Sequence, residues 1–242
     1  MHEALLRPYR IIYGSLLVRL IFFFLSFAAV AAASAPLRQM DYAVTFRFAR
    51  VVEYVYSVVC LTTGLTVFFA LTELRGASAW FGKAATWFIL EAAVNAVSDF
   101  SGVALDVTDA GMDGGSVLAA IYVFTTAAAL LAPLFMNLFM FGHLLRGYRE
   151  VCETCGKNGD RLLRLQRLVA AACGTLVTGT ALLLLLYAVS QRNPGAQLLS
   201  GGPLLVSALA LFFLGAVLQL IVQLRILRET RAMIALVKEI SF

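Results

Sequence analysis

Long runs of apolar residues recur six times along the chain of 242 residues. Each run has about 20 residues or more, the length that an α-helix needs to cross the roughly 30 Å hydrocarbon core of a bilayer. The runs lie at residues 11–34, 51–72, 84–105, 116–142, 168–190 and 203–224. The pattern predicts an all-α integral membrane bundle of about six transmembrane helices, with residues 1–242 forming one polytopic domain.

Short stretches of turn-forming residues separate these runs. They are Ala35-Pro36, Arg75-Gly76, Gly111 with Gly114-Gly115, residues 156–159, and Asn193-Pro194-Gly195. No low-complexity tract, linker or internal repeat interrupts the series. Such short joints favour an up-and-down bundle in which consecutive helices are antiparallel.

The composition supports a bilayer environment. Hydrophobic residues make up 61% of the chain and charged residues 14%, whereas soluble domains contain roughly 45–50% apolar and about 25% charged residues. A single soluble core of this length could not bury so much apolar surface, but lipid can solvate it. The expected partner is therefore the lipid bilayer.

The first apolar run has an alternative interpretation as a cleaved signal peptide, because it begins after basic residues and ends in small ones. We favour a retained helix, since the apolar stretch already begins at Ile11 and Pro36 would follow the cleavage point directly. About a dozen strongly apolar residues, each favourable by around 0.3–0.6 kcal/mol, offset the roughly 2.5–3.5 kcal/mol cost of Arg19 within the span. Cleavage would leave five spans.

The basic residues are distributed unequally between the two sides of the predicted bundle. With the N-terminus inside, 14 of them face the cytoplasm and four face outward, while Arg19 lies within the membrane. The outward four are Arg38, Arg47, Arg50 and Arg192. The positive-inside rule then predicts that both termini are cytoplasmic. The net charge of +5 is explained by topology, so we expect no nucleic-acid partner.

Ionisable residues within the spans are the most informative positions, because lipid excludes charge. Arg19 and Glu91 lie about 12 Å and 10 Å from the inner ends of their spans, at 1.5 Å per residue, and are expected to pair. Further polar residues extend this predicted intramembrane network: Asn95, Asp99, Asn137 and Gln219. Glu91, Asn95 and Asp99 share one helix face, and Asp99 is expected to pair with Arg47 or Arg50.

Two basic segments flank the membrane on the expected cytoplasmic side. Their arginines alternate with apolar residues and are Arg161, Arg164, Arg167, Arg225, Arg228 and Arg231. Residues 225–242 form a basic amphipathic tail on this interpretation. Such segments suit an anionic lipid surface, although ordinary flanking charge that fixes the topology is an equal alternative.

Small residues on the fifth helix form two motifs, Ala170-x-x-x-Gly174 and Thr175-x-x-x-Gly179, and Ala92 and Ala96 do likewise on the third. They permit close helix approach, either within the chain or between copies of it.

Catalytic and metal signatures are missing from the sequence. Cys152 and Cys155 supply half of a zinc site, and Asp106, Asp109 and Asp113 do not have the spacing of a calcium loop. Nucleotide-binding, serine-hydrolase and HExxH motifs are absent. We therefore expect no enzyme activity, no cofactor and no metal. The favoured function is a structural or organising subunit, assembled with itself or with other membrane proteins; the alternative is a small channel or transporter that uses Arg19, Glu91 and Asp99.

Overall fold

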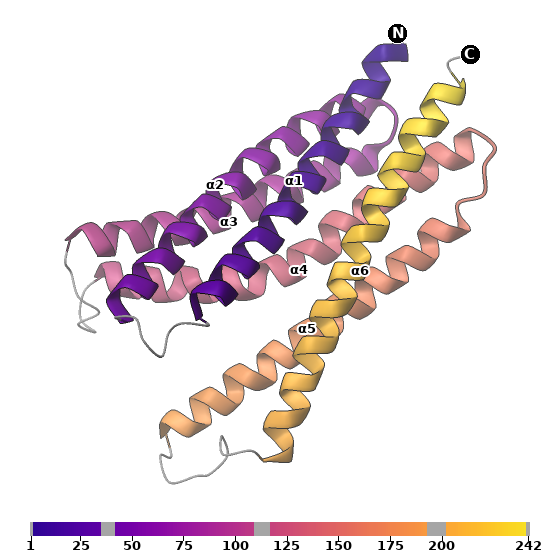
Figure 1. The fold of residues 1–242 in the computed structure, drawn as a ribbon. Coiled ribbons are helices and arrows are strands. Elements are labelled where there is room, and N and C mark those ends of the chain that lie inside the picture. The colour runs from indigo at the N-terminus through magenta and orange to yellow at the C-terminus, as the bar shows by residue number, and fades with distance from the viewer. Residues whose placement is uncertain (1, 35–41, 109–116, 193–201, 241–242) are drawn as a thin grey trace. The chain divides into compact units, whose positions relative to one another are not determined.

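The structure, a computed structural model, describes the backbone of residues 2–34, 42–108, 117–192 and 202–240 (Figure 1). Its described side chains are those of residues 6–25, 28, 51–97, 135–186 and 202–240, apart from residues 53 and 184. Over these residues the elements are helical: α1 His2–Ser34, α2 Tyr42–Glu73, the 3-10 turn η1 Leu74–Gly76, α3 Ala79–Thr108, α4 Val117–Thr154, α5 Asp160–Arg192 and α6 Pro203–Ile240. The all-α prediction is confirmed.

The described part of each predicted span coincides with part of one helix, but the helices are longer than the spans. Hydropathy marks only the apolar part of a helix, whereas backbone hydrogen bonding continues into its polar ends. The basic segment 161–167 begins α5, and residues 225–240 continue α6.

Four helices contain a described segment that is long and apolar enough to cross a membrane: Leu6–Leu25, Tyr54–Gly76, Asp160–Leu183 and Pro203–Ile240. The predicted spans 84–105 and 116–142 lie partly outside the described side chains. The count of six spans and the orientation of the termini therefore stay predictions.

Local chemistry fixes where α3 begins and where α4 ends. At the start of α3 the Ser78 hydroxyl accepts a hydrogen bond from the Trp80 amide at 3.2 Å, as an N-cap does. At the end of α4, Gly156 adopts φ +70°, and the Lys157 amide donates to the Cys152 carbonyl at 2.9 Å. This is the Schellman arrangement, in which glycine has no steric penalty.

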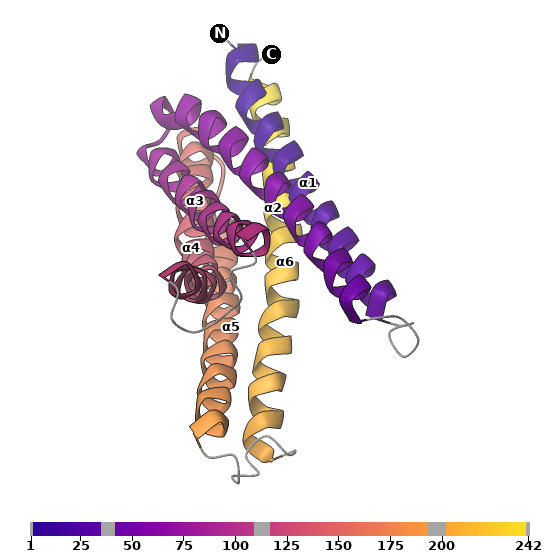
Figure 2. The same ribbon diagram turned by 90° about the vertical axis from the view of Figure 1, so that its left-hand side faces the viewer.

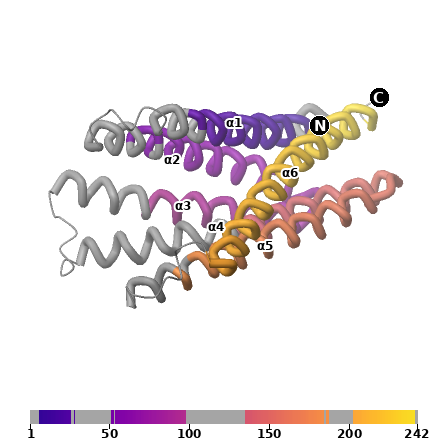
Figure 3. Tube along the Cα trace, turned by 60° about the horizontal axis from the view of Figure 1, so that its bottom comes forward, coloured from indigo at the N-terminus to yellow at the C-terminus, as the bar shows by residue number. Residues whose placement is uncertain are grey.

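The described chain divides into two compact units: residues 1–74, 88–129 and 230–242 in the first, and residues 75–87 and 130–229 in the second. In the first unit α1 and α2 run side by side and antiparallel (Figures 1 and 2). The same unit holds the beginning of α1 and the end of α6, which lie together in all three views (Figure 3). In the second unit α5 and the first part of α6 are antiparallel.

Both units expose large apolar side chains. On α2 these side chains include Val51, Val55, Val58, Leu65 and Phe69, whose spacing places them along one helix face. On α6, Phe213 is 63% exposed and Val217 55%. Continuous apolar faces of this kind suit contact with lipid or with a protein partner.

Candidate functional site

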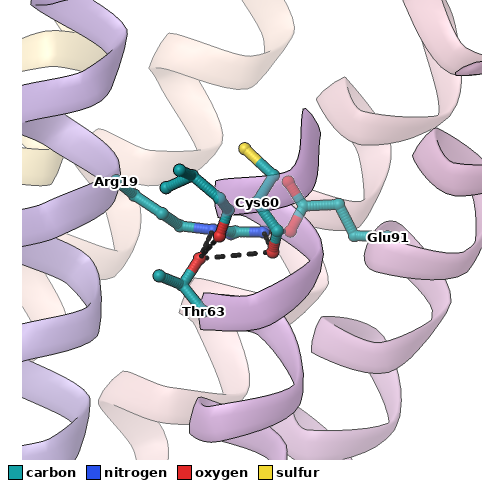
Figure 4. A network of polar contacts seen from close by, with 5 residues as sticks. Arg19, Cys60, Thr63 and Glu91 are labelled. Atoms are coloured by element: carbon teal, nitrogen blue, oxygen red, sulfur yellow. Dashed lines mark hydrogen bonds and ion pairs between the residues drawn. The ribbon is translucent and has the colours of Figure 1, made fainter. Parts of the chain in front are cut away.

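An arginine within the first candidate span joins three helices of the first unit (Figure 4). Arg19 Nη1 on α1 lies 2.9 Å from Glu91 Oε2 on α3, and the two side chains are only 13% and 11% exposed. The ion pair expected from their matching depths is therefore present. Charge neutralisation of this kind lowers the cost of holding either group away from water.

The second helix supplies the remaining acceptors for this guanidinium. Arg19 Nε donates to Thr63 Oγ1 at 3.0 Å, and Nη2 donates to the Cys60 carbonyl oxygen at 3.1 Å. Thr63 in turn donates to the Val59 carbonyl oxygen at 2.6 Å. Each of the three guanidinium nitrogens thus has a protein acceptor, so the charge is fixed in place by α2 as well as by Glu91.

A glycine allows α2 and α3 to approach each other at the level of this ion pair. A methyl group placed on Gly64 would lie 2.9 Å from the Ala92 Cβ, which is closer than real Cβ contacts. Ala92 itself is fully buried. The expectation that Ala92 permits close helix approach is confirmed, and its counterpart on α2 is Gly64.

The other residues of the predicted network are not brought to this ion pair by described contacts. Asn95 follows Glu91 by one turn of α3 and is half-buried, whereas the side chain of Asp99 and those of Arg47 and Arg50 lie outside the described residues. The Asp99 pairing therefore stays a prediction.

Asn137 and Gln219 belong to the second unit, and both are half-buried. The amide nitrogen and oxygen of Gln219 are buried without a hydrogen-bond partner among the described residues. Their membership of one network with Arg19 stays a prediction.

The six arginines of the predicted basic faces differ in their contacts. Arg161 Nε forms an ion pair with Glu229 Oε2 at 3.1 Å, which joins the start of α5 to α6 within the second unit. Arg164, Arg167, Arg225, Arg228 and Arg231 are exposed. Their role at an anionic lipid surface stays a prediction.

The two cysteines of the CxxC segment differ in burial. Cys152 is buried and Cys155 is half-buried. Burial raises the pKa of the Cys152 thiol, which disfavours the thiolate that binds metals. Among the described residues, no group of three His, Cys, Asp or Glu side chains is placed to hold a metal ion.

Sequence reasoning missed a stack of aromatic rings between α3 and α4 in the second unit. Trp80 stacks on His143 with ring centroids 5.4 Å apart, His143 lies 6.4 Å from Phe139, and Phe139 stacks on Trp87 at 4.8 Å. The sequence contained a signal for this stack. Trp80 and Trp87 are seven residues apart, and Phe139 and His143 are four apart, so each pair lies on one face of its helix.

Comparison of the chain with family models, with curated proteins and with solved structures found no match. The structure describes a helical protein with several apolar helices that are compatible with a membrane.

Proposed function

We propose that this chain is a multi-pass integral membrane protein that acts as a non-enzymatic organising or assembly subunit. Six helices would span the bilayer, with both termini in the cytoplasm. The protein would act through helix packing and through its basic cytoplasmic faces, bound to further copies of itself or to other membrane proteins.

The observation that carries this proposal is that the Arg19 guanidinium, within the first candidate span, is held by several protein partners. A group that transfers ions must exchange partners, whereas Arg19 is held by Glu91, Thr63 and the Cys60 carbonyl oxygen at 2.9–3.1 Å. These three contacts favour a structural tie between α1, α2 and α3 over a conduction path. The channel or transporter alternative draws on Asn95, one turn from Glu91 on α3, and on Asp99 beyond it.

Two further observations support placement in a membrane. Large apolar side chains are exposed on α2 and α6, including Phe69 at 61% and Phe213 at 63%. The beginning of α1 and the end of α6 lie together within the first unit, and this agrees with both termini on one side of the membrane.

Reconstitution into liposomes tests the proposal against its alternative. We expect ion and solute flux no greater than in empty liposomes. We also expect a stable assembly, either of several copies or with other membrane proteins, in mild-detergent extracts of native membranes. Flux that Glu91→Gln abolishes would establish the channel or transporter instead.

The matched control is Glu73→Gln, which removes the same charge from an exposed position at the end of α2. Flux lost in the Glu91 variant and kept in the Glu73 variant would assign conduction to the buried network. A chain that migrates as a lone monomer in every mild extract would contradict the organising role.

A further inference from the structure

Two cations converge on the ring of Trp80 at one end of the aromatic stack. The Nζ atom of Lys83 lies 4.1 Å from the ring centroid, and Cζ of Arg146 lies 4.8 Å from it. Lys83 is on α3 and Arg146 on α4, and both side chains are exposed. Cation–π contacts hold them in place but leave their positive charges without a counterion.

Neither cation has a carboxylate partner within the part of the chain that the structure describes. Two carboxylates lie nearby on α4: Glu153 pairs with Arg149 at 2.7 Å, and Glu150 accepts from the Ser78 hydroxyl at 2.6 Å, which leaves its negative charge in place. Lys83, Arg146 and Arg149 against Glu150 and Glu153 leave a net charge of +1 at this end. Such an excess of positive charge favours binding of an anion.

The electrostatic state of His143 agrees with this excess of positive charge. Burial in the ring stack lowers its imidazole pKa, and Arg146 and Lys83 lower it further. The Nδ1 atom of His143 is buried without a hydrogen-bond partner among the described residues. A bound anion near the two cations would weaken their effect on this ring.

A hollow of about 500 Å³ borders the cationic end of the stack, between the start of α3, the end of α4 and the start of α5. Its wall is formed by Trp80 of α3, by Arg146, Arg149, Glu150 and Glu153 of α4, and by Leu163 and Gln166 of α5. Gln166 is fixed there, since its side-chain amide donates to the Gly142 carbonyl oxygen at 3.0 Å. The hollow gives a polar group room beside Arg146.

The rings continue from this end into the apolar part of the helices. Trp87 and Phe139 lie within the predicted spans 84–105 and 116–142, whereas Trp80, Lys83 and Arg146 lie outside them. Trp80 and Trp87 are seven residues apart, so the stack covers roughly 10 Å along the helix at 1.5 Å per residue. That distance joins the headgroup level of a leaflet to its hydrocarbon.

We propose that this cluster is a binding site for an anionic phospholipid of the cytoplasmic leaflet, with Lys83 and Arg146 contacting the phosphate and an acyl chain lying along Phe139 and Trp87. A free phosphate ion could contact the same two cations as the phosphate of a lipid headgroup. The lipid is favoured because the apolar rings follow directly, where a free ion has nothing to contact. Basic pockets between transmembrane helices commonly bind lipid headgroups in this way.

The site rests on the membrane placement proposed above, and flotation of the reconstituted protein with liposomes tests that placement separately. If the protein does not float with the liposomes, the proposed membrane placement is wrong. If the protein floats but shows no preference for anionic lipid, only the proposed lipid site is wrong.

Tryptophan fluorescence reports this site alone, because the chain has two tryptophans and both belong to the ring stack. The protein is reconstituted in phosphatidylcholine vesicles that contain a minor fraction of lipid with brominated acyl chains. The brominated lipid is phosphatidylglycerol in one series and phosphatidylcholine in the other. We expect stronger quenching by the anionic lipid at equal mole fraction.

The variant Lys83→Gln/Arg146→Gln should lose this preference. At about 1 kcal/mol for each cation near a lipid surface and tenfold per about 1.4 kcal/mol, the relative affinity for the anionic lipid should fall about 25-fold. The matched control is Arg7→Gln/Arg10→Gln, which removes two exposed charges from α1 and should keep the preference. Equal quenching by both lipids, or equal losses in the two double variants, would overturn the site.

A second measurement uses the unaltered protein and so does not depend on variant folding. Anionic lipid should raise the pKa of His143 by more than that of His2, the other histidine of the chain, as followed by nuclear magnetic resonance in bicelles. Equal shifts would contradict the site. Inorganic phosphate added to protein in neutral detergent should produce neither effect; full effects at millimolar phosphate would identify a free-anion site and overturn the lipid assignment.

Discussion

At the scale of single residues, Arg19 is the position where an unfavourable side chain is made compatible with an apolar span. Its three guanidinium nitrogens reach acceptors on α2 and α3. Depth along two apolar segments predicted Glu91 as a partner. Thr63 and the Cys60 carbonyl oxygen could not be predicted, because they depend on how α2 is rotated about its own axis.

We expect the substitutions Arg19→Leu and Glu91→Leu to be non-additive. Each single change leaves a buried charge without its partner, which typically costs about 3–5 kcal/mol. The double change removes both charges and should destabilise the protein less than either single one. The free energy of unfolding in bicelles, measured for all four proteins of the cycle, checks this; a double variant equal to the sum of the singles would show that the two groups are not coupled.

His143 should make stability depend on pH. Its pKa is lowered in the folded protein by burial and by Arg146 and Lys83, so the folded state prefers the neutral ring. This contribution is fully present above the unfolded pKa of about 6.5 and is lost as pH falls through the lower folded value. The melting temperature in thermal unfolding should therefore fall as the pH is lowered from neutral to acidic.

The substitution His143→Gln should reduce that pH dependence. A pH profile that is the same in both proteins would exclude His143 as its source.

At the scale of elements, the packing of α5 against α6 depends on two glycines. A methyl group on Gly179 would lie 2.5 Å from the Phe212 backbone nitrogen, and one on Gly215 would lie 2.7 Å from the Leu176 Cα. The sequence motif Thr175-x-x-x-Gly179 predicted such an approach. The companion motif at Gly174 did not identify a contact, since no described atom lies within 4 Å of a methyl group placed there.

Gly179→Ala should therefore destabilise the protein by about 1–3 kcal/mol, the usual cost of overpacking, because backbone atoms of α6 cannot move aside cheaply. Gly174→Ala is the matched control on the same helix. It should be neutral or stabilising by up to about 1 kcal/mol through helix propensity. Unfolding in mild detergent measures both, and equal effects would contradict the assigned α5–α6 contact.

At the scale of the whole molecule, the charge distribution along the chain sets the expected topology. Excess lysine and arginine holds the short loops on the cytoplasmic side during insertion. In a cysteine-free background, Ser200→Cys should react with a membrane-impermeant maleimide in intact cells, because it lies in the predicted outer loop between the last two spans. Asn158→Cys, in the cytoplasmic loop, should react only after the membrane is permeabilised. The reverse pattern would invert the proposed orientation.

The sequence by itself determined the helical class, the approximate place of each helix and the segments suited to a bilayer. These follow from the length and local apolarity of each run, which do not depend on the rest of the chain. Charge counts likewise predicted an orientation, because the insertion bias acts on each loop near the membrane.

Only the tertiary structure decided which faces meet. Rotation and offset of one helix against another are set by the packing of all its neighbours, and no local pattern encodes them. The Gly64–Ala92 approach, the Arg161–Glu229 ion pair and the two cations above Trp80 are therefore properties of the folded chain. The predicted depth of each residue in its apolar span identified the Arg19–Glu91 pair, while packing supplied the hydrogen bonds that fix it.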